Sequence, residues 1–302
     1  MNKEPFFIVG VGRSGTTMLR LMLTSHPSIA VPYESHFLTR YYEKLDSYGA
    51  LEQRENLETL LRDILSEELL LSWDHEFDFD ELISEIAEPV TLGSVFNAVY
   101  LNYARAKNKV RWGDKSDYLD RVHIVNDIFP DAKFIHIVRD GRDVVNSVLK
   151  LPWGPKDILA GAEWWSDHVK MAQIVGRVLG KSRYLVVKYE DLVANPESEL
   201  TRVCEFLGEE FSADMLNYHK TAKELIPEQR RAQHQNTDGP PKSDRCYAWK
   251  NEMCAAYQGF FSRVCDSTLN DLGYEIPDTE ISNLQFKKLK IKSYLKRSLS
   301  FS

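Results

Sequence analysis

Short apolar runs that alternate with amphipathic stretches organise much of the chain. The runs Phe6–Val9, Phe134–Val138 and Tyr184–Val187 are rich in aromatic and β-branched residues, which is typical of buried strands. A shorter run, Ile29–Val31, predicts a further strand. Strands that alternate with helices in this way predict an α/β domain of three layers, in which helices flank a mainly parallel central sheet.

Apolar residues at helical spacing follow three of these strands. The first helix ends at His26-Pro27, because the residue before a proline is disfavoured in the α conformation. Pro196 stands where the start of a helix tolerates proline. The predicted buried faces consist of Met18, Leu19, Met22 and Leu23, of Val144, Val145, Val148 and Leu149, and of Leu200, Val203, Cys204 and Leu207.

Residues 41–108 interrupt the alternation. They are rich in Glu, Leu and Tyr, and apolar positions between Leu57 and Leu65 recur at helical spacing. We predict a helical cap over one end of the sheet, and we expect this stretch to set the specificity for the molecule acted upon. No glycine-rich linker separates it from the rest, so we expect residues 1–302 to form a single domain.

Two polar segments lie late in the chain. Residues 229–245 contain Asp238-Gly239-Pro240-Pro241, which predicts a loop. The basic tail, residues 285–302, holds six Lys or Arg residues with apolar residues between them. This pattern predicts a basic amphipathic helix, which we expect to pack on its own domain; contact with a membrane is the alternative.

The composition limits the classes of partner. The net charge is −7, so the protein as a whole is not built to sit on nucleic acid, and any bound anion needs a local cluster of Arg and Lys. The first apolar run is far too short for a secretion signal or a membrane span. The four cysteines show no Cys-x-x-Cys pairing, which favours neither zinc nor a disulfide framework. These features predict a cytosolic (cytoplasmic) protein.

The loop Gly10–Thr17, between the first strand and its helix, has the pattern of an anion-binding loop. Glycines let the backbone approach a phosphate, and the N-terminus of the following helix adds partial positive charge. The spacing matches the nucleotide-binding pattern G-x-x-x-x-G-K-[ST], except that Thr16 replaces the lysine that reaches the β- and γ-phosphates. A cation stands earlier instead, at Arg13. The departure argues against a kinase or an ATPase.

At this loop the sequence resembles the sulfotransferase family, in its bacterial and tyrosylprotein-type branch, whose members have a P-loop-like fold. Their loop reads [KR]-x-G-T-T, and Arg13-Ser14-Gly15-Thr16-Thr17 fits it. The resemblance implies that Ser14, Gly15, Thr16, Thr17 and the loop amides hold the 5′-phosphosulfate of 3′-phosphoadenosine 5′-phosphosulfate (PAPS). It also implies that Arg13 lies beside the bridging oxygen of the leaving group, adenosine 3′,5′-bisphosphate (PAP).

The other half of the donor site in this family binds the 3′-phosphate. An arginine at a strand end and a serine eight residues later are matched by Arg139 and Ser147. Arginine suits a phosphate because its planar fork donates two parallel hydrogen bonds. The resemblance further implies that Tyr189 lies near the nucleotide, and that Arg245 and Lys250 fold over the 3′-phosphate.

The candidate base follows the second short strand, in Tyr33-Glu34-Ser35-His36. Sulfuryl transfer needs a deprotonated acceptor and relief of the negative charge on the departing phosphate. The resemblance implies that Glu34 is the base, with His36 as the alternative because histidine titrates in the right range. It also implies that Lys115 stabilises the leaving group together with Arg13. The sequence contains no metal-ligand pattern, and we expect no metal requirement.

Three functions are consistent with these observations. The first is a PAPS-dependent sulfotransferase acting on a hydroxyl or amine of a small-molecule, lipid or carbohydrate acceptor. The second is a phosphotransferase of the P-loop type, which the missing lysine disfavours. The third is a non-catalytic nucleotide-binding protein, which the presence of Arg13, Glu34 and Lys115 disfavours.

Overall fold

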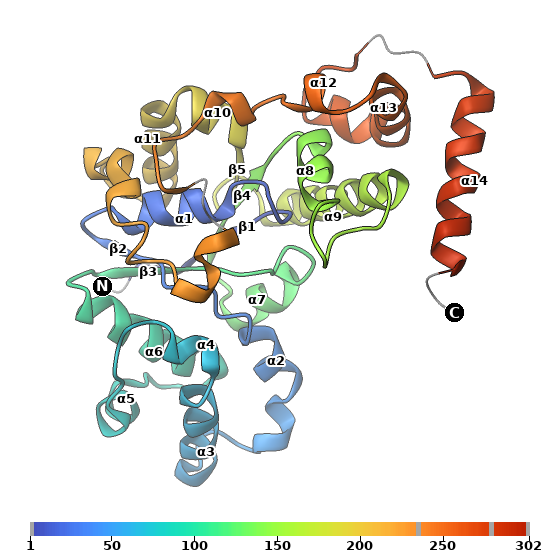
Figure 1. Cartoon of the computed structure of the whole chain (residues 1–302). Coiled ribbons are helices and arrows are strands. Elements are labelled where there is room, and N and C mark those ends of the chain that lie inside the picture. The colour runs from blue at the N-terminus through green and yellow to red at the C-terminus, as the bar shows by residue number, and fades with distance from the viewer. Residues whose placement is uncertain (1–2, 234–236, 278–280, 300–302) are drawn as a thin grey trace.

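The computed structural model describes residues 3–233, 237–277 and 281–299 (Figure 1). Its centre is a five-stranded sheet with the strand order β2-β3-β1-β4-β5, in which every pairing is parallel. Helices flank this sheet, so the predicted α/β architecture is confirmed. The strands are β1 Phe6–Val9, β2 Ile29–Ala30, β3 Arg111–Lys115, β4 Lys133–Val138 and β5 Tyr184–Lys188.

The central strands are apolar because both of their faces are covered. All four residues of β1 are buried, and its register places Phe6 between Gly113 of β3 and Lys133 of β4. Strands buried on both faces read as continuous apolar runs rather than as alternating ones. This is why β1 and β4 were predicted from the sequence, whereas β5 is an edge strand that was predicted from its run of apolar residues although Val186 is exposed.

Strand β3 was not predicted, because three of its five residues, Arg111, Asp114 and Lys115, are charged and yet buried. Arg111 donates hydrogen bonds to the main-chain carbonyls of Glu4 and Leu207, and it pairs with Glu209 at 3.2 Å. These partners offset the cost of burying the guanidinium ion. Because they come from other parts of the chain, hydrophobic periodicity cannot reveal them.

The helices that follow the strands lie where the apolar spacing predicted them. Helix α1 covers β1 and ends at Thr24, before His26-Pro27, and α11 begins with Pro196. The helices of this part of the chain are α1 Thr16–Thr24, α7 Val122–Ile128, α8 Gly141–Val148, α9 Ile158–Leu179, α10 Tyr189–Ala194, α11 Pro196–Leu207, α12 Trp249–Glu252 and α13 Ala255–Asp271.

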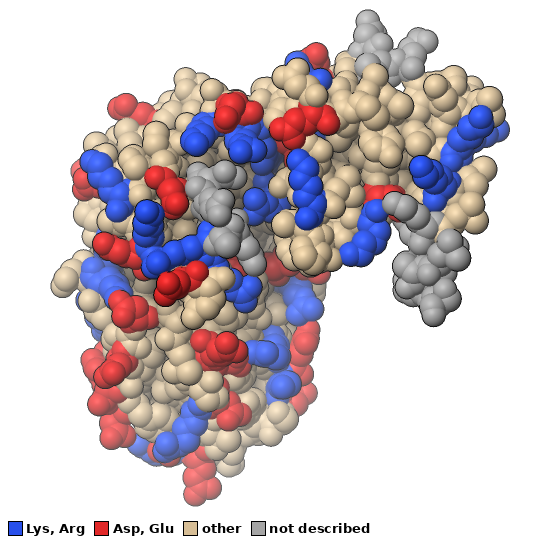
Figure 2. All heavy atoms as spheres, viewed as in Figure 1, with Lys and Arg blue, Asp and Glu red and all other residues tan. Residues whose placement is uncertain are grey.

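Residues 41–108 are helical, as predicted, and form the lobe at the bottom of Figure 1. This lobe adjoins the edge of the sheet through α6, which packs against β2 and β3. Acidic and basic side chains are interspersed over the lobe, whereas several basic side chains gather on the face above it (Figure 2). The elements here are α2 Leu38–Glu43, η1 Leu45–Tyr48, α3 Arg54–Leu65, α4 Glu68–Leu71, α5 Phe79–Glu85 and α6 Leu92–Ala106.

The predicted loop 229–245 contains two short 3₁₀ turns in its described part. These are η3 Glu228–Gln233 and η5 Ser243–Arg245, and residues 234–236 lie outside the described residues. A further 3₁₀ segment, η2 Ala213–Lys220, packs against α1.

The basic tail forms helix α14, Asn283–Leu299, and residues 300–302 lie outside the described residues. Helix α14 packs against α9 and α13, with the ring of Phe286 at 4.9 Å from that of Phe260. The predicted contact of the tail with its own domain is therefore confirmed, while contact with a membrane stays a prediction. Within the described ranges, no helix has both the length and the apolar character needed to cross a bilayer.

Candidate functional site

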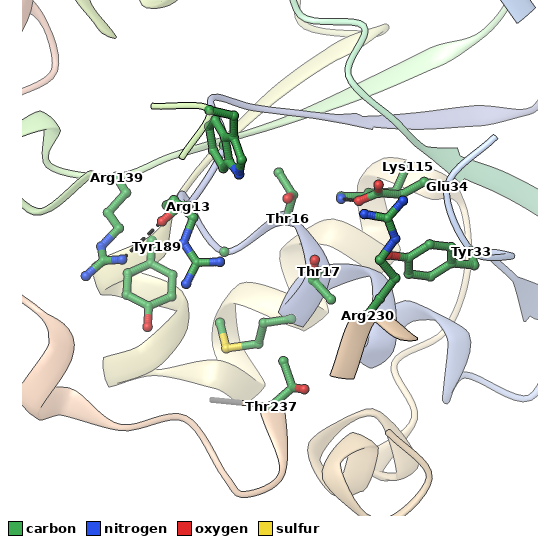
Figure 3. A pocket seen from close by; sticks show the side chains of 14 residues that line it. Arg13, Thr16, Thr17, Tyr33, Glu34, Lys115, Arg139, Tyr189, Arg230 and Thr237 are labelled. Atoms are coloured by element: carbon green, nitrogen blue, oxygen red, sulfur yellow. Dashed lines mark hydrogen bonds and ion pairs between the residues drawn. The ribbon is translucent and has the colours of Figure 1, made fainter. Parts of the chain in front are cut away.

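The carboxyl ends of all five strands contribute to one site. The loop Gly10–Thr17 follows β1, Glu34 follows β2, Lys115 ends β3, Arg139 follows β4 and Tyr189 follows β5. In a parallel sheet these ends lie along the same edge, where open α/β folds bind their ligands. All five segments line a cavity of about 290 Å³ (Figure 3).

The loop after β1 is shaped by Gly15, which starts α1 with a φ of 95°. A Cβ atom at this position would lie 2.5 Å from Cδ2 of Tyr189, so both the backbone angle and the space require glycine. Among the described residues no side chain caps α1, and the first N–H groups of a helix have no partner within it. These N–H groups, together with the helix dipole, form an anion-binding position.

The hydroxyl groups of the loop fit an anion at this position. Thr16 and Thr17 line the cavity, as predicted. Ser14 lies behind it, 1% exposed, and its buried Oγ has no hydrogen-bond partner in the described part of the chain. A buried hydroxyl without a partner costs free energy, which a phosphosulfate oxygen would offset. The residues present therefore fit the predicted donor.

One end of the cavity is strongly basic (Figure 3). The Arg13 Nε donates a hydrogen bond to Ser147 Oγ at 3.3 Å, and Arg139 donates one to the main-chain carbonyl of Arg13 at 3.0 Å. The Arg139 guanidinium lies 4.6 Å from the centre of the Tyr189 ring. Burial, followed by the charge of Arg139, lowers the pKa of Arg13. An anion bound between the two guanidinium ions would relieve this repulsion. The structure thus brings together Arg13, Arg139, Ser147 and Tyr189, as the sequence predicted.

The segment after η5 is fastened to the same end through Asp143. Its carboxylate accepts hydrogen bonds from the main-chain N–H groups of Tyr247 and Trp249, each at 2.8 Å. Burial raises the pKa of Asp143 to about 6. The main-chain carbonyl of Arg245 accepts a hydrogen bond from Arg139 at 2.6 Å. The segment therefore lies against the basic end, as the family resemblance implied.

The side chains of Arg245 and Lys250 are not among the described residues that line the cavity. Arg245 contributes its carbonyl group, and the Lys250 Nζ pairs with Glu275 at 2.6 Å on the surface. The predicted contacts of Arg245 and Lys250 with a 3′-phosphate stay predictions.

The other end of the cavity holds the candidate base. The Glu34 carboxylate pairs with the Lys115 ammonium through Oε1, and its Oε2 accepts a hydrogen bond from His36 Nε2 at 2.7 Å. Burial raises the pKa of Glu34, but the charge of Lys115 and the hydrogen bonds from His36 and Lys115 outweigh it and hold the pKa well below its ordinary value. The sequence predicted these three residues, and the structure brings them together.

A buried network fixes this end of the cavity. The Ser35 hydroxyl donates a hydrogen bond to Asp114 at 2.8 Å and lies 2.8 Å from the Tyr118 hydroxyl. The Ser116 hydroxyl accepts hydrogen bonds from the main-chain N–H groups of Ser35 and His36 and donates one to Asp114. The network ties the turn that carries Glu34 to the strand that carries Lys115. Fully partnered buried networks of this kind specify one geometry.

Sequence reasoning missed several residues that line the cavity. Arg230, from η3, lies beside Tyr33 and Glu34 (Figure 3). Burial and the charge of Glu34 raise the pKa of Tyr33 to about 12, although Arg230 opposes this shift. Arg230 could have been found from the sequence, because Arg230 and Arg231 are adjacent arginines in a polar segment of an acidic chain. The other missed lining residues are Met18, Trp153 and Thr237, while Gly12 belongs to the predicted loop Gly10–Thr17.

A second cavity, of about 210 Å³, shares Gly12, Thr16, Glu34, Lys115 and Trp153 with the first. The candidate base therefore faces two adjoining spaces. Neither cavity is lined by a residue of 41–108, the whole of which the structure describes.

Metal-ligating side chains do not gather in the described ranges. Among residues 3–233, 237–277 and 281–299, no three His, Cys, Asp or Glu side chains are grouped so that they could hold an ion. Whether the reaction needs a metal stays a prediction.

Comparison with known proteins identifies the family. The model of the sulfotransferase family matches residues 5–213. The chain belongs to the sulfotransferase family. It is similar to the protein-tyrosine sulfotransferase of Drosophila melanogaster, with 28% identity over 71% of this chain and 40% of the relative. It is also similar to protein-tyrosine sulfotransferase 2 of Gallus gallus, with 30% identity over 71% of this chain and 53% of the relative. This sulfotransferase thus spans about half the length of these curated relatives.

A solved structure confirms the fold of the sulfotransferase. The sulfotransferase domain from the Synechococcus PCC 7002 olefin synthase superposes with a TM-score of 0.62 at 24% identity, and the match covers 91% of this chain and 97% of that domain. The expected P-loop-like fold is therefore confirmed.

Proposed function

We propose that this sulfotransferase moves the sulfuryl group of PAPS onto a hydroxyl or amine of its acceptor, with Glu34 as the base. The observation that carries the proposal is the layout of one cavity. The anion-binding loop lines the cavity between its two ends. Arg13 and Arg139 form the basic end, and the Glu34–Lys115 pair forms the other end. Two separate anion-binding positions suit an adenosine phosphorylated at both 3′ and 5′ better than a linear triphosphate. The absence of lysine at Thr16 points the same way.

The proposed reaction is an in-line displacement at sulfur. The acceptor oxygen or nitrogen forms a bond to sulfur while its proton passes to Glu34. The bond between sulfur and the bridging oxygen breaks, and PAP leaves with that electron pair. Arg13 and Lys115 stabilise the negative charge that develops on the bridging oxygen.

Lys115 links the two halves of this reaction. Its ammonium holds Glu34 ionised in the structure, and a low pKa makes a carboxylate a weak base. Developing charge on the leaving group competes with Glu34 for the same ammonium. As Lys115 moves toward the leaving group, burial dominates at Glu34, and its pKa rises toward a value that suits proton transfer.

Loss of Arg139 tests the proposed position of the 3′-phosphate. We expect Arg139→Ala to weaken PAP binding by about 10- to 100-fold, as for the loss of hydrogen bonds to a charged group. Adenosine 5′-monophosphate, which lacks the 3′-phosphate, is expected to bind the variant and the wild type alike. Isothermal titration calorimetry measures both ligands. Arg54→Ala, on the exposed surface of α3, is the matched control and is expected to change neither affinity. Equal weakening of both nucleotides would contradict the assignment.

The acceptor and the location of the enzyme belong to the same proposal. We place the acceptor among small molecules, lipids and carbohydrates, and the protein in the cytosol. The relatives do not narrow this choice. Beside the protein-tyrosine sulfotransferases, a relative from Mycobacterium tuberculosis that is 23% identical, over 75% of this chain and 71% of its own, is named an omega-hydroxy-beta-dihydromenaquinone-9 sulfotransferase.

A further inference from the structure

The second cavity has a lining unlike that of the first. Trp153, in the turn before α9, and Trp164, in the first half of α9, both face it, and Trp153 remains 59% exposed. His168 lies one turn after Trp164, with 5.5 Å between the centres of the two rings. The rest of the polar lining consists of Thr16, Glu34, His36, Lys115, Ser116 and Asp117. Apolar ring faces and hydrogen-bonding groups therefore meet in a small space beside the candidate base.

The hydrogen bonds of His168 define what it offers to a ligand. Its Nδ1 lies 2.7 Å from the main-chain carbonyl oxygen of Trp164, which only accepts hydrogen bonds. Nδ1 therefore carries the proton, and in the neutral ring Nε2 is the hydrogen-bond acceptor. Glu34 and Asp117 are also acceptors when ionised. The cavity therefore favours a ligand that carries several hydrogen-bond donors over a ligand that carries one.

The charge of this cavity differs from that of the donor site. Its single lysine, Lys115, is paired with Glu34, and Asp117 takes part in no ion pair among the described residues. The first cavity, by contrast, is lined by Arg13, Arg139 and Arg230. A phosphate or carboxylate group has no unopposed cation to bind in the second cavity. An uncharged ligand suits it better.

We propose that the second cavity receives one uncharged, polyhydroxylated ring, the sugar unit of a carbohydrate acceptor. This inference rests on the proposed function. The C–H face of the ring packs on Trp153 and Trp164, one hydroxyl donates to Glu34, and a neighbouring hydroxyl donates to His168 Nε2. A phenol has a single hydroxyl and would leave His168 without a donor. Sites built to bind a hydroxyl discriminate strongly against ligands that lack it.

The hydroxyl bonded to Glu34 is the one that becomes sulfated. Its oxygen forms the new bond to sulfur, Glu34 takes its proton, and PAP departs with the electrons of the broken sulfur–oxygen bond. Acceptor specificity then resides in the segment after β3, in the turn before α9 and in the first half of α9. Residues 41–108, which the sequence led us to expect to set this specificity, do not border the cavity.

The test is turnover of labelled PAPS by the full chain with two acceptor classes. One is a panel of methyl glycosides of glucose, galactose, mannose and N-acetylglucosamine, and the other is 4-cresol, a phenol with one hydroxyl. We expect at least one glycoside to exceed 4-cresol in kcat/KM by about 10-fold or more. We expect His168→Ala to lower kcat/KM for that glycoside by about 10- to 100-fold, while its affinity for PAP stays within about twofold of the wild type. His123→Ala, exposed on α7, is the control and should change neither quantity.

The outcomes separate this inference from the proposed function. Saturation-transfer NMR of the PAP-bound protein should show the glycoside ring protons in contact with the protein. PAP binding combined with a preference for 4-cresol, or with turnover of none of the glycosides, overturns the sugar assignment alone. Equal losses for glycoside and 4-cresol in His168→Ala also overturn it. A wild-type protein that does not bind PAP overturns the proposed function, and the inference falls with it.

Discussion

Replacing Glu34 with glutamine is expected to lower kcat by about two to four orders of magnitude, the usual contribution of a general base. Glutamine keeps the shape of the side chain and its place between Lys115 and His36, but it cannot accept the proton of the acceptor. PAP binding is expected to persist, because the basic end of the donor cavity is unchanged. Turnover of labelled PAPS, measured beside calorimetric titration with PAP, separates the two properties.

The prediction for Glu34 has a control variant and an outcome that would contradict it. Glu58→Gln removes a carboxylate from the surface of α3 and is expected to leave turnover unchanged. Wild-type turnover in Glu34→Gln would remove Glu34 as the base. His36, which shares the hydrogen bond at 2.7 Å, would then be the remaining candidate at this end of the cavity.

Replacing Lys115 with methionine is expected to lower kcat by about 10²- to 10³-fold and to change its pH dependence. The loss of rate follows from removing a cation beside the leaving group. The change with pH follows from Glu34, because Lys115 is what holds its pKa below the ordinary value against burial. Without the ammonium the pKa of Glu34 rises, so more of the base is protonated at mildly acid pH. As the pH is lowered, kcat/KM of the variant should therefore begin to fall at a higher pH than kcat/KM of the wild type.

The pH profile distinguishes this role of Lys115 from a merely structural one. Lys181→Met, at an exposed position between α9 and β5, serves as the control and is expected to keep the wild-type profile. A Lys115→Met variant with reduced kcat and an unmoved acid limb would show that Lys115 does not set the pKa of Glu34. An unchanged kcat would show that it does not act on the leaving group.

The sequence was sufficient for the parts of the fold that rest on local patterns. The apolar strands β1, β4 and β5 and the loop Gly10–Thr17 follow from residues that are adjacent in the chain. The order of the strands and the convergence of their ends do not, since they depend on pairings between distant segments. The resemblance to a family supplied Glu34 as the base and Lys115 as a cation beside the leaving group, whereas the ion pair between them appears only in the structure.

What the sequence could not show lies in contacts made over long separations. Strand β3 is polar because Arg111 and Asp114 find partners elsewhere in the chain, so no periodicity marks it. Arg230 and Trp153 reach the site from segments without a recognisable motif. Lys250 fits a family pattern, yet in the structure it pairs with Glu275. A motif fixes where a residue stands in the chain, whereas its side-chain partner depends on packing.

The measurement that tests the account most directly is calorimetric titration of the wild-type chain with PAP and with ATP. The account predicts saturable binding of PAP with one site per chain, and binding of ATP that is at least about 10-fold weaker, because the basic end built by Arg13 and Arg139 is matched by a 3′-phosphate. Tight binding of ATP with no response to PAP would contradict the account and would point to phosphoryl transfer.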